Sequence, residues 1–128
     1  MKPTRSSQPP IIGVLPLGEI DPAFLSRLSE RLEEIFAGYR TKLVASCDLQ
    51  ATSYDLSRNQ YHSTKILRSL SELARQGDVG RLLGVTEVDL YVPSLNFVFG
   101  EAEYRRNVAV ISIFRLRPKL YHEENGSL

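Results

Sequence analysis

The feature that most constrains the fold is an alternation of continuous apolar runs with amphipathic segments. Residues 11–18, IIGVLPLG, are apolar throughout, and residues 41–49 and 81–92 are largely apolar. Runs of this kind are typical of strands buried on both faces of a sheet. Because a helical pattern separates each run from the next, the order strand, helix, strand, helix, strand predicts right-handed crossovers and a parallel sheet.

The first helical pattern has the clearest boundaries. Asp21 is a natural N-cap, and Pro22 suits the first helical position, where a missing N–H costs nothing. Gly38 is expected to cap the C-terminal end. Between them, apolar side chains recur at three- and four-residue spacing and form one stripe. The stripe consists of Phe24, Leu25, Leu28, Leu32, Ile35 and Phe36.

A second helix is predicted from Ser63 or Thr64 to about Gln76–Gly77, because apolar residues again recur at helical spacing. Residues 50–63, which precede it, are polar and rich in turn-forming residues, so we expect a connecting loop there.

The pattern changes after Pro93. Residues 95–104 alternate between apolar and polar, 105–107 suit a turn, and 108–114 are apolar again. Two strands joined by a short turn form an antiparallel hairpin, and the alternating strand is the better candidate for the sheet edge. The predicted fold class is α/β: a twisted, mostly parallel sheet of about five strands with one antiparallel edge strand and two helices.

Composition excludes several partners. The 128 residues suit one domain, and 16 basic residues against 15 acidic ones give no field that would attract nucleic acid or an anionic membrane. No apolar run approaches the length of a membrane span. Residues 1–10 are polar and proline-rich and lack the apolar core of a signal peptide, so we expect a flexible arm on a cytoplasmic protein.

The residues that usually carry chemistry do not cluster. His62 and His122 lie far apart, and neither belongs to an HExxH motif. The one cysteine, Cys47, excludes a multi-thiolate metal site. Glu87 and Asp89 share one side of a strand by period-2 spacing, for which a structural role is the default. The sequence also lacks the glycine patterns that bind phosphates, so we assign no catalytic residue, no metal ligand and no cofactor to this chain.

The edge hairpin is the feature that suggests binding. An exposed edge strand offers unpaired N–H and C=O groups to which an extended peptide can add as a further strand. LNFVFG, residues 95–100, is uncharged, whereas an edge guarded against such pairing usually carries lysine, proline or a bulge. The predicted peptide-binding residues are Leu95, Asn96, Phe97, Val98, Phe99, Gly100, Glu101 and Ala102.

Four segments carry a family resemblance: IIGVLPLGEID, YDLSRNQYHST, LLGVTEVDLYVPSLNFVFGEAE and VAVISIFRLRP. Together they resemble the N-terminal portion of the archaemetzincins, which are metzincin-type zinc metallopeptidases. The resemblance covers residues 11–118 and implies a metzincin-like N-terminal subdomain. Residues 119–128 would then be a polar tail, after which the zinc-binding helix of the family is expected.

In such enzymes the edge strand aligns the substrate, and a HExxHxxGxxH motif holds the catalytic zinc. A Met-turn and a second, largely cysteine-bound zinc are also implied by the resemblance. The only methionine here is Met1 and the only cysteine is Cys47, and the histidine motif is absent. The resemblance therefore implies zinc for the complete family enzyme and a chain that is inactive by itself.

Three functions stay open at this point. The first is the substrate-aligning part of an archaemetzincin-like peptidase, and the second is a non-catalytic module that binds peptides or proteins along residues 95–102. The third is a small doubly wound nucleotide- or phosphate-binding domain. The missing glycine fingerprint disfavours the third. Without a zinc-binding helix, one sheet face is expected to expose an apolar patch, so the partner would be a missing C-terminal half or a second copy.

Overall fold

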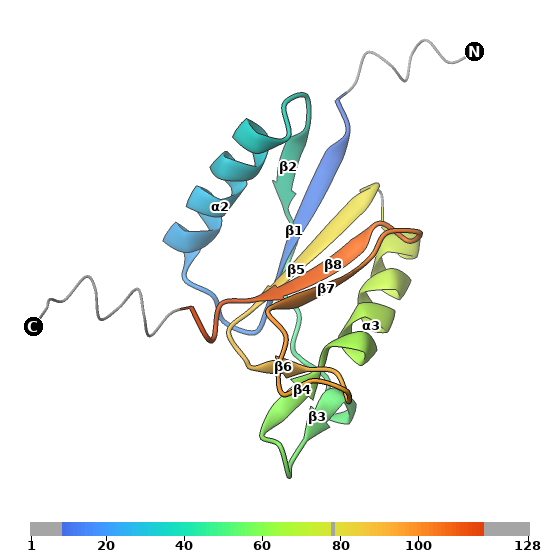
Figure 1. Cartoon of the computed structure of the whole chain (residues 1–128). Coiled ribbons are helices and arrows are strands. Elements are labelled where there is room, and N and C mark those ends of the chain that lie inside the picture. The colour runs from blue at the N-terminus through green and yellow to red at the C-terminus, as the bar shows by residue number, and fades with distance from the viewer. Residues whose placement is uncertain (1–8, 78, 117–128) are drawn as a thin grey trace, which may run out of the picture.

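A computed structural model describes residues 9–77 and 79–116 of the protein. Its centre is a five-stranded sheet with the strand order β2-β1-β5-β8-β7 (Figure 1). Strands β2, β1, β5 and β8 pair in parallel, and β7 pairs antiparallel with β8. The predicted fold class and the antiparallel edge strand are therefore confirmed. The strands are β1 (Ile11–Leu17), β2 (Arg40–Leu43), β5 (Arg81–Thr86), β7 (Gly100–Glu103) and β8 (Val108–Ser112).

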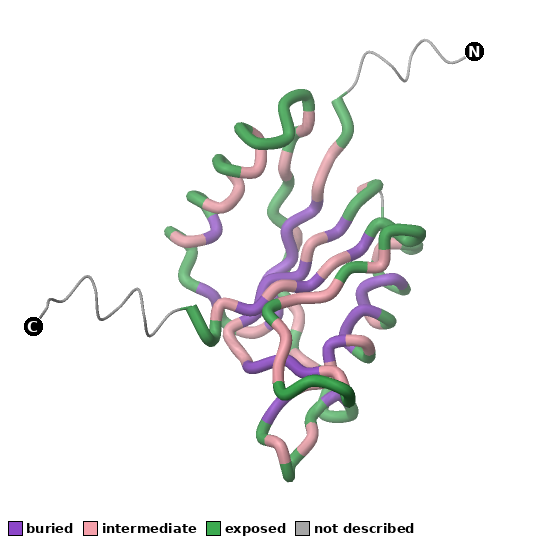
Figure 2. The backbone as a smooth tube through the Cα atoms, viewed as in Figure 1, coloured by how far each residue is buried: buried purple, intermediate pink, exposed green. Residues whose placement is uncertain are grey.

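The two helices cover opposite faces of this sheet (Figure 1). Helix α2 (Pro22–Ile35) packs on one face and helix α3 (Ser63–Gln76) on the other. Side chains of β1 alternate between the two cores: Val14 belongs to the cluster beneath α2, and Leu15 to the cluster beneath α3. Figure 2 shows the buried residues concentrated in the central strands and along α3. This two-sided burial explains why the strand segments are apolar runs instead of alternating ones.

The start of α2 and both bounds of α3 follow their sequence signals closely. The carboxylate of Asp21 accepts a hydrogen bond of 3.0 Å from the backbone N–H of Ala23, and Pro22 is the first helical residue. The predicted cap at Gly38 is wrong: the helix ends at Ile35 with Phe36 at the C-cap position, and Gly38 lies in the following turn with φ +96°. Helix α3 spans Ser63–Gln76, as predicted.

Two predicted strands are shorter than expected, and the predicted loop contains structure. Only the first residues of the 41–49 run form the strand β2, although Cys47 adds an isolated parallel bridge to Leu17. The strand predicted over 81–92 stops at Thr86. The end of that run joins a separate three-stranded sheet of order β3-β4-β6. Its elements and a neighbouring 3-10 helix are β3 (Tyr54–Asp55), β4 (Gln60–His62), β6 (Leu90–Tyr91) and η1 (Ala51–Ser53).

Helix α2 covers only part of the sheet face on which it packs. Ile35 and Phe36, at the end of the predicted apolar stripe, are 61% and 48% exposed. An apolar hollow lies between α2 and the strands β5, β8 and β7. Leu28, Leu32, Leu83, Ala109, Ile111 and Tyr104 are among its lining residues.

Within the described ranges, no helix is long and apolar enough to span a bilayer. The predicted N-terminal arm, residues 1–10, lies outside the described residues except for Pro9 and Pro10. The predicted tail, residues 119–128, lies outside them as well, and His122 with it.

Candidate functional site: an open sheet edge beside helix α3

Strand β7 forms one edge of the large sheet. It pairs with β8 on one side, and no described strand pairs with its other side. The register places Ala102 opposite Ala109. Within the described residues, the outer backbone groups of β7 have no strand partner, so an extended peptide could add to the sheet at this edge.

The ladder determines which residues of β7 point outward. The N–H of Ser112 donates to the carbonyl of Phe99 at 2.8 Å, which makes these two residues a hydrogen-bonded pair. Bonded and non-bonded pairs alternate along an antiparallel ladder. The backbone groups of Glu101 therefore also point toward β8, whereas those of Gly100 and Ala102 point away from the sheet.

Most of the predicted docking segment does not lie on this edge. Residues 95–99 precede β7, and backbone groups of this stretch are already hydrogen-bonded within the fold. The bonds run from Arg58 Nη1 to Leu95 O (3.2 Å), from Gln60 Nε2 to Asn96 O (2.8 Å) and from Val98 N to Leu90 O (2.9 Å). The expected strand over 95–102 is thus shortened to the segment that begins at Gly100, and its substrate-binding role stays a prediction.

A polar network holds the segment that leads to the edge. Asp89 is 9% exposed, and its carboxylate accepts two hydrogen bonds from Arg115, at 2.9 and 2.8 Å. Gln60 Nε2 donates to the same carboxylate at 2.9 Å. The Arg115 guanidinium also lies 3.8 Å from the ring centre of Phe97. Asp89 therefore has the structural role expected by default, but sequence reasoning missed its partner Arg115.

Arg58 supports the same segment from the other side. Its guanidinium lies 4.1 Å from the ring centre of Tyr91 and donates to the carbonyl of Leu95 and, at 3.4 Å, to that of Pro93. A planar guanidinium suits this combination of ring stacking and several donors. The loop before β7 is thereby fixed by side chains that lie about 30 to 40 positions earlier in the chain.

The Asp89 network gives a pH-dependent contribution to stability. Hydrogen bonding from Arg115 is the main cause that lowers the pKa of Asp89, against the opposing effect of burial, and Gln60 lowers it further. A lowered folded-state pKa stabilises the fold above the unfolded value, about 3.9, and this contribution is lost as pH falls through the folded pKa. We expect Asp89→Asn to lower the urea midpoint at about pH 6, with the difference narrowing below about pH 4. An equal difference at both pH values would contradict this expectation.

Glu101 connects the edge strand to helix α3. Its carboxylate accepts hydrogen bonds from the hydroxyls of Ser63 and Thr64, the first two residues of the helix. His62 at the N-cap position provides no side-chain cap. These two hydroxyl contacts attach β7 to the start of α3, where the helix dipole also favours a negative charge.

The described residues do not fit a zinc site. No group of three or more His, Cys, Asp or Glu among residues 9–77 and 79–116 could hold a metal ion. His62 packs against Tyr91, with ring centres 5.0 Å apart, and its Nδ1 is buried without a hydrogen-bond partner. Burial, and secondarily the charge of Lys65, lowers the pKa of His62, which favours the neutral ring.

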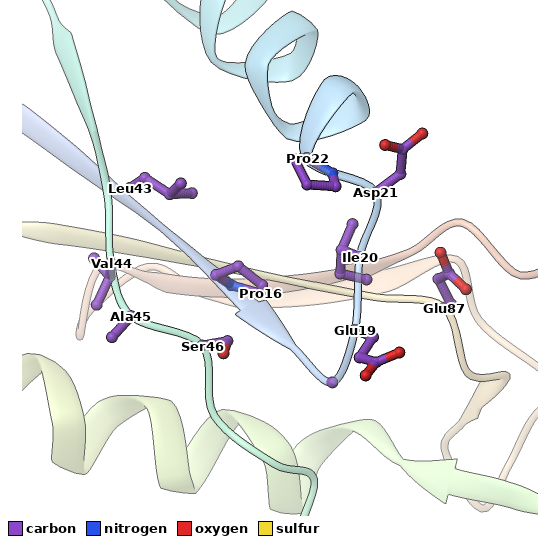
Figure 3. Close-up of a pocket in the computed structure, with 11 residues that line it drawn as sticks. Pro16, Glu19, Ile20, Asp21, Pro22, Leu43, Val44, Ala45, Ser46 and Glu87 are labelled. Carbon is purple, nitrogen blue, oxygen red and sulfur yellow. The ribbon is translucent and has the colours of Figure 1, made fainter.

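A second hollow lies at the carboxyl ends of β1 and β2, where α/β folds often bind phosphates (Figure 3). Its lining includes Glu19, Asp21 and Glu87. The carboxylate of Asp21 also accepts from the backbone N–H of Ala23 in the first turn of α2. Three carboxyl groups and a self-capped helix disfavour an anionic ligand, which argues against the phosphate-binding hypothesis.

No family model matches the chain. The chain is, however, 42% identical over 117 residues to the archaemetzincin of Pyrococcus furiosus, covering 88% of this chain and 61% of that protein. The crystal structure of the Methanopyrus kandleri archaemetzincin superposes with a TM-score of 0.75 at 31% identity, covering 91% of this chain and 66% of that one.

A zinc-dependent peptidase from Methanocorpusculum labreanum superposes with a TM-score of 0.71 at 28% identity, covering 86% of this chain and 67% of that one. The chain thus spans about three fifths of the length of the curated relative from Pyrococcus furiosus.

Proposed function

Because the chain belongs to the archaemetzincin family, we propose that it is the substrate-aligning part of a zinc-dependent metallopeptidase. In this proposal, the outer edge of β7 receives an extended peptide. The observation that carries it is the geometry of the ladder, which leaves the backbone N–H and C=O groups of Gly100 and Ala102 pointing away from the sheet.

The proposed role is orientation. Each outward-facing residue offers one donor and one acceptor, so a peptide added to β7 would be held extended by ladder hydrogen bonds. Holding a peptide bond in a fixed position lowers the entropic part of a later reaction barrier. Glu101 and the Asp89 network keep the strand in place, so that little ordering of the protein would accompany binding.

Zinc in the complete family enzyme would polarise the scissile carbonyl and activate water. The described residues do not fit such a site, and no HExxH motif occurs in the 128 residues. We therefore propose that these residues hydrolyse nothing by themselves. Taken alone, they would act as a peptide-binding module that uses the same edge of β7.

Replacing Ala102 by proline tests the docking edge. Proline lacks the outward N–H but keeps the inward ladder bonds, since prolines are tolerated on edge strands when the missing donor faces solvent. We expect the Ala102→Pro chain to bind a fluorescein-labelled, blocked nonapeptide of alternating Thr and Lys at least about ten-fold more weakly, a loss of about 1.4 kcal/mol. Fluorescence polarisation measures the affinity, and circular dichroism checks that the fold is retained.

Ala102→Val is the matched control, because valine enlarges the side chain, keeps the N–H and suits a strand. It should bind the peptide about as well as the unaltered chain. If the proline and valine variants bind equally well, then the peptide does not add to β7 as a strand.

A further inference from the structure

We propose that the edge of β7 selects peptides by charge, with basic side chains two residues apart placed opposite Glu101 and Glu103. This inference rests on the proposed docking function and names the class of peptide that would dock. The inference depends on two observations about β7. The side chains of Glu101 and Glu103 lie on the same face of the sheet, and the backbone groups of Gly100 and Ala102 point outward.

The two glutamates share the α3 face of the sheet. Glu101 is placed there by its hydrogen bonds to Ser63 and Thr64, and Glu103 follows two residues later, so its side chain points to the same face. Their partners on β8 agree, because Val110 and Val108, which lie opposite them, belong to the core cluster beneath α3.

The outward ladder brings a docked peptide close to these two carboxylates. Peptide residues that bond to Gly100 and Ala102 would alternate with residues lying opposite Glu101 and Glu103 in non-hydrogen-bonded positions, where side chains approach most closely. Opposite side chains in such pairs lie on one face with Cβ atoms about 4.5–5.5 Å apart, and opposite charges there stabilise pairing. Lysine or arginine at these two positions is therefore favoured.

The same rule disfavours a second copy of the chain as the occupant. When two β7 strands pair antiparallel through their outer edges, outward-bonding residues must face outward-bonding residues. In any such register that brings the glutamates of the two copies together, a glutamate of one copy lies directly opposite a glutamate of the other. Like charges directly opposite each other destabilise the pairing. Two carboxylates thus protect the edge against self-association while favouring a basic peptide.

Glu103 is the more available of the two carboxylates. Glu101 already accepts hydrogen bonds from α3, whereas Glu103 forms no ion pair or side-chain hydrogen bond with another described residue. Arg68 and Arg106 line the same hollow as both glutamates but are exposed, and they belong to α3 and to the β7–β8 turn instead of the strand. They are therefore not the direct cross-strand neighbours of a docked peptide.

The test compares three blocked nonapeptides, in which Thr alternates with Lys, Gln or Glu, on the full 128-residue chain. We expect the Lys peptide to bind roughly two- to five-fold more tightly than the Gln peptide for each ion pair formed, and the Glu peptide to bind most weakly. The preference should shrink at about 1 M salt, where the screening length falls to about 3 Å. Glu103→Lys should weaken the binding of the Lys peptide and strengthen the binding of the Glu peptide.

Glu30→Lys is the matched control. It makes the same change in net charge on the exposed surface of α2, away from β7, and should leave the order of the three peptides unchanged. If all three peptides bound equally well, charge selection would be wrong. If Ala102→Pro still weakened their binding, the proposed docking on β7 would stand. If the chain preferred the Glu peptide and Arg106→Gln removed this preference, selection by the two glutamates would be wrong. The arginines of the neighbouring hollow would then select the peptide. If no peptide bound, the docking function itself would fail.

Discussion

Replacing Leu70 by alanine is expected to lower the free energy of unfolding by about 2–5 kcal/mol. Leu70 is 1% exposed and lies in the core cluster between α3 and the sheet. Truncating it removes buried apolar surface and leaves a cavity that the close-packed strands can fill only in part. Since small domains are stable by about 5–15 kcal/mol, this change is a large fraction of the total. Urea unfolding followed by circular dichroism measures it.

The partner of Leu70 across this interface is the glycine of β5. A Cβ added to Gly84 would lie 3.0 Å from Cδ1 of Leu70 and 3.0 Å from Cδ1 of Leu17. Gly84→Ala alone should therefore overpack the core, with a cost on the order of 1–3 kcal/mol. In the double variant Leu70→Ala with Gly84→Ala, the added methyl group occupies part of the vacated space, so the combined cost should be less than the sum. Strict additivity would show that the two residues do not compete for space.

Gly100→Ala is expected to destabilise the hairpin that forms the docking edge, by about 1–3 kcal/mol. An added Cβ would lie 2.6 Å from the backbone carbonyl oxygen of Val110 and 3.1 Å from Cγ2 of Ile111. A backbone atom cannot rotate away as a side-chain end can, so β7 and β8 must separate locally. Amide hydrogen exchange of residues 108–112 should accelerate, and the blocked Thr-Lys peptide should bind more weakly.

The control for this change is Gly80→Ala, which makes the same substitution where no atom lies within 4 Å of the added Cβ. It should be neutral or slightly stabilising, because alanine restricts the unfolded chain more than glycine does. If Gly100→Ala proves as harmless as Gly80→Ala in both exchange and binding, then the close approach of β7 and β8 at Gly100 does not hold the edge in place.

Two networks distant in sequence prepare the edge that these predictions probe. The Asp89–Arg115 pair and Gln60 fix the loop before β7, and Glu101 attaches the strand itself to the start of α3. Removing the carboxylate of Asp89 would leave Gln60 and Arg115 without their shared acceptor. The pH dependence of Asp89→Asn therefore reports on the support of the edge as well as on overall stability.

Local sequence signals were sufficient to predict the two helices and the antiparallel pairing of the hairpin strands. Asp21 and Pro22 mark the start of α2 by chemistry that acts within a few residues, and the predicted α3 has the observed bounds. The sequence predicts one strand over 81–92 because the run is largely apolar. Apolar character does not distinguish one buried strand from two that lie in different sheets, as β5 and β6 do.

The candidate site was located by sequence but not delimited by it. Residues 95–99 lack charge, as expected for an open edge, yet Arg58 and Gln60 donate to the backbone carbonyl groups of Leu95 and Asn96 from about 37 positions away. Phe97 and Phe99 also contact each other, with ring centres 5.3 Å apart. The bonds from Arg58 and Gln60 join distant parts of the chain and leave no local pattern, so sequence reasoning assigned to the edge a segment whose backbone is already bonded.

The sequence by itself determined the α/β class, the start of α2, the bounds of α3, the antiparallel edge and the family. These properties depend on periodicity, helix capping and the similarity of short sequence segments, all of which involve near neighbours in the chain. Only the tertiary structure decided that the outward backbone groups belong to Gly100 and Ala102, and that Glu101 and Glu103 share the α3 face. Both depend on the register between β7 and β8 and on the packing of α3, where a one-residue shift would exchange inward and outward groups.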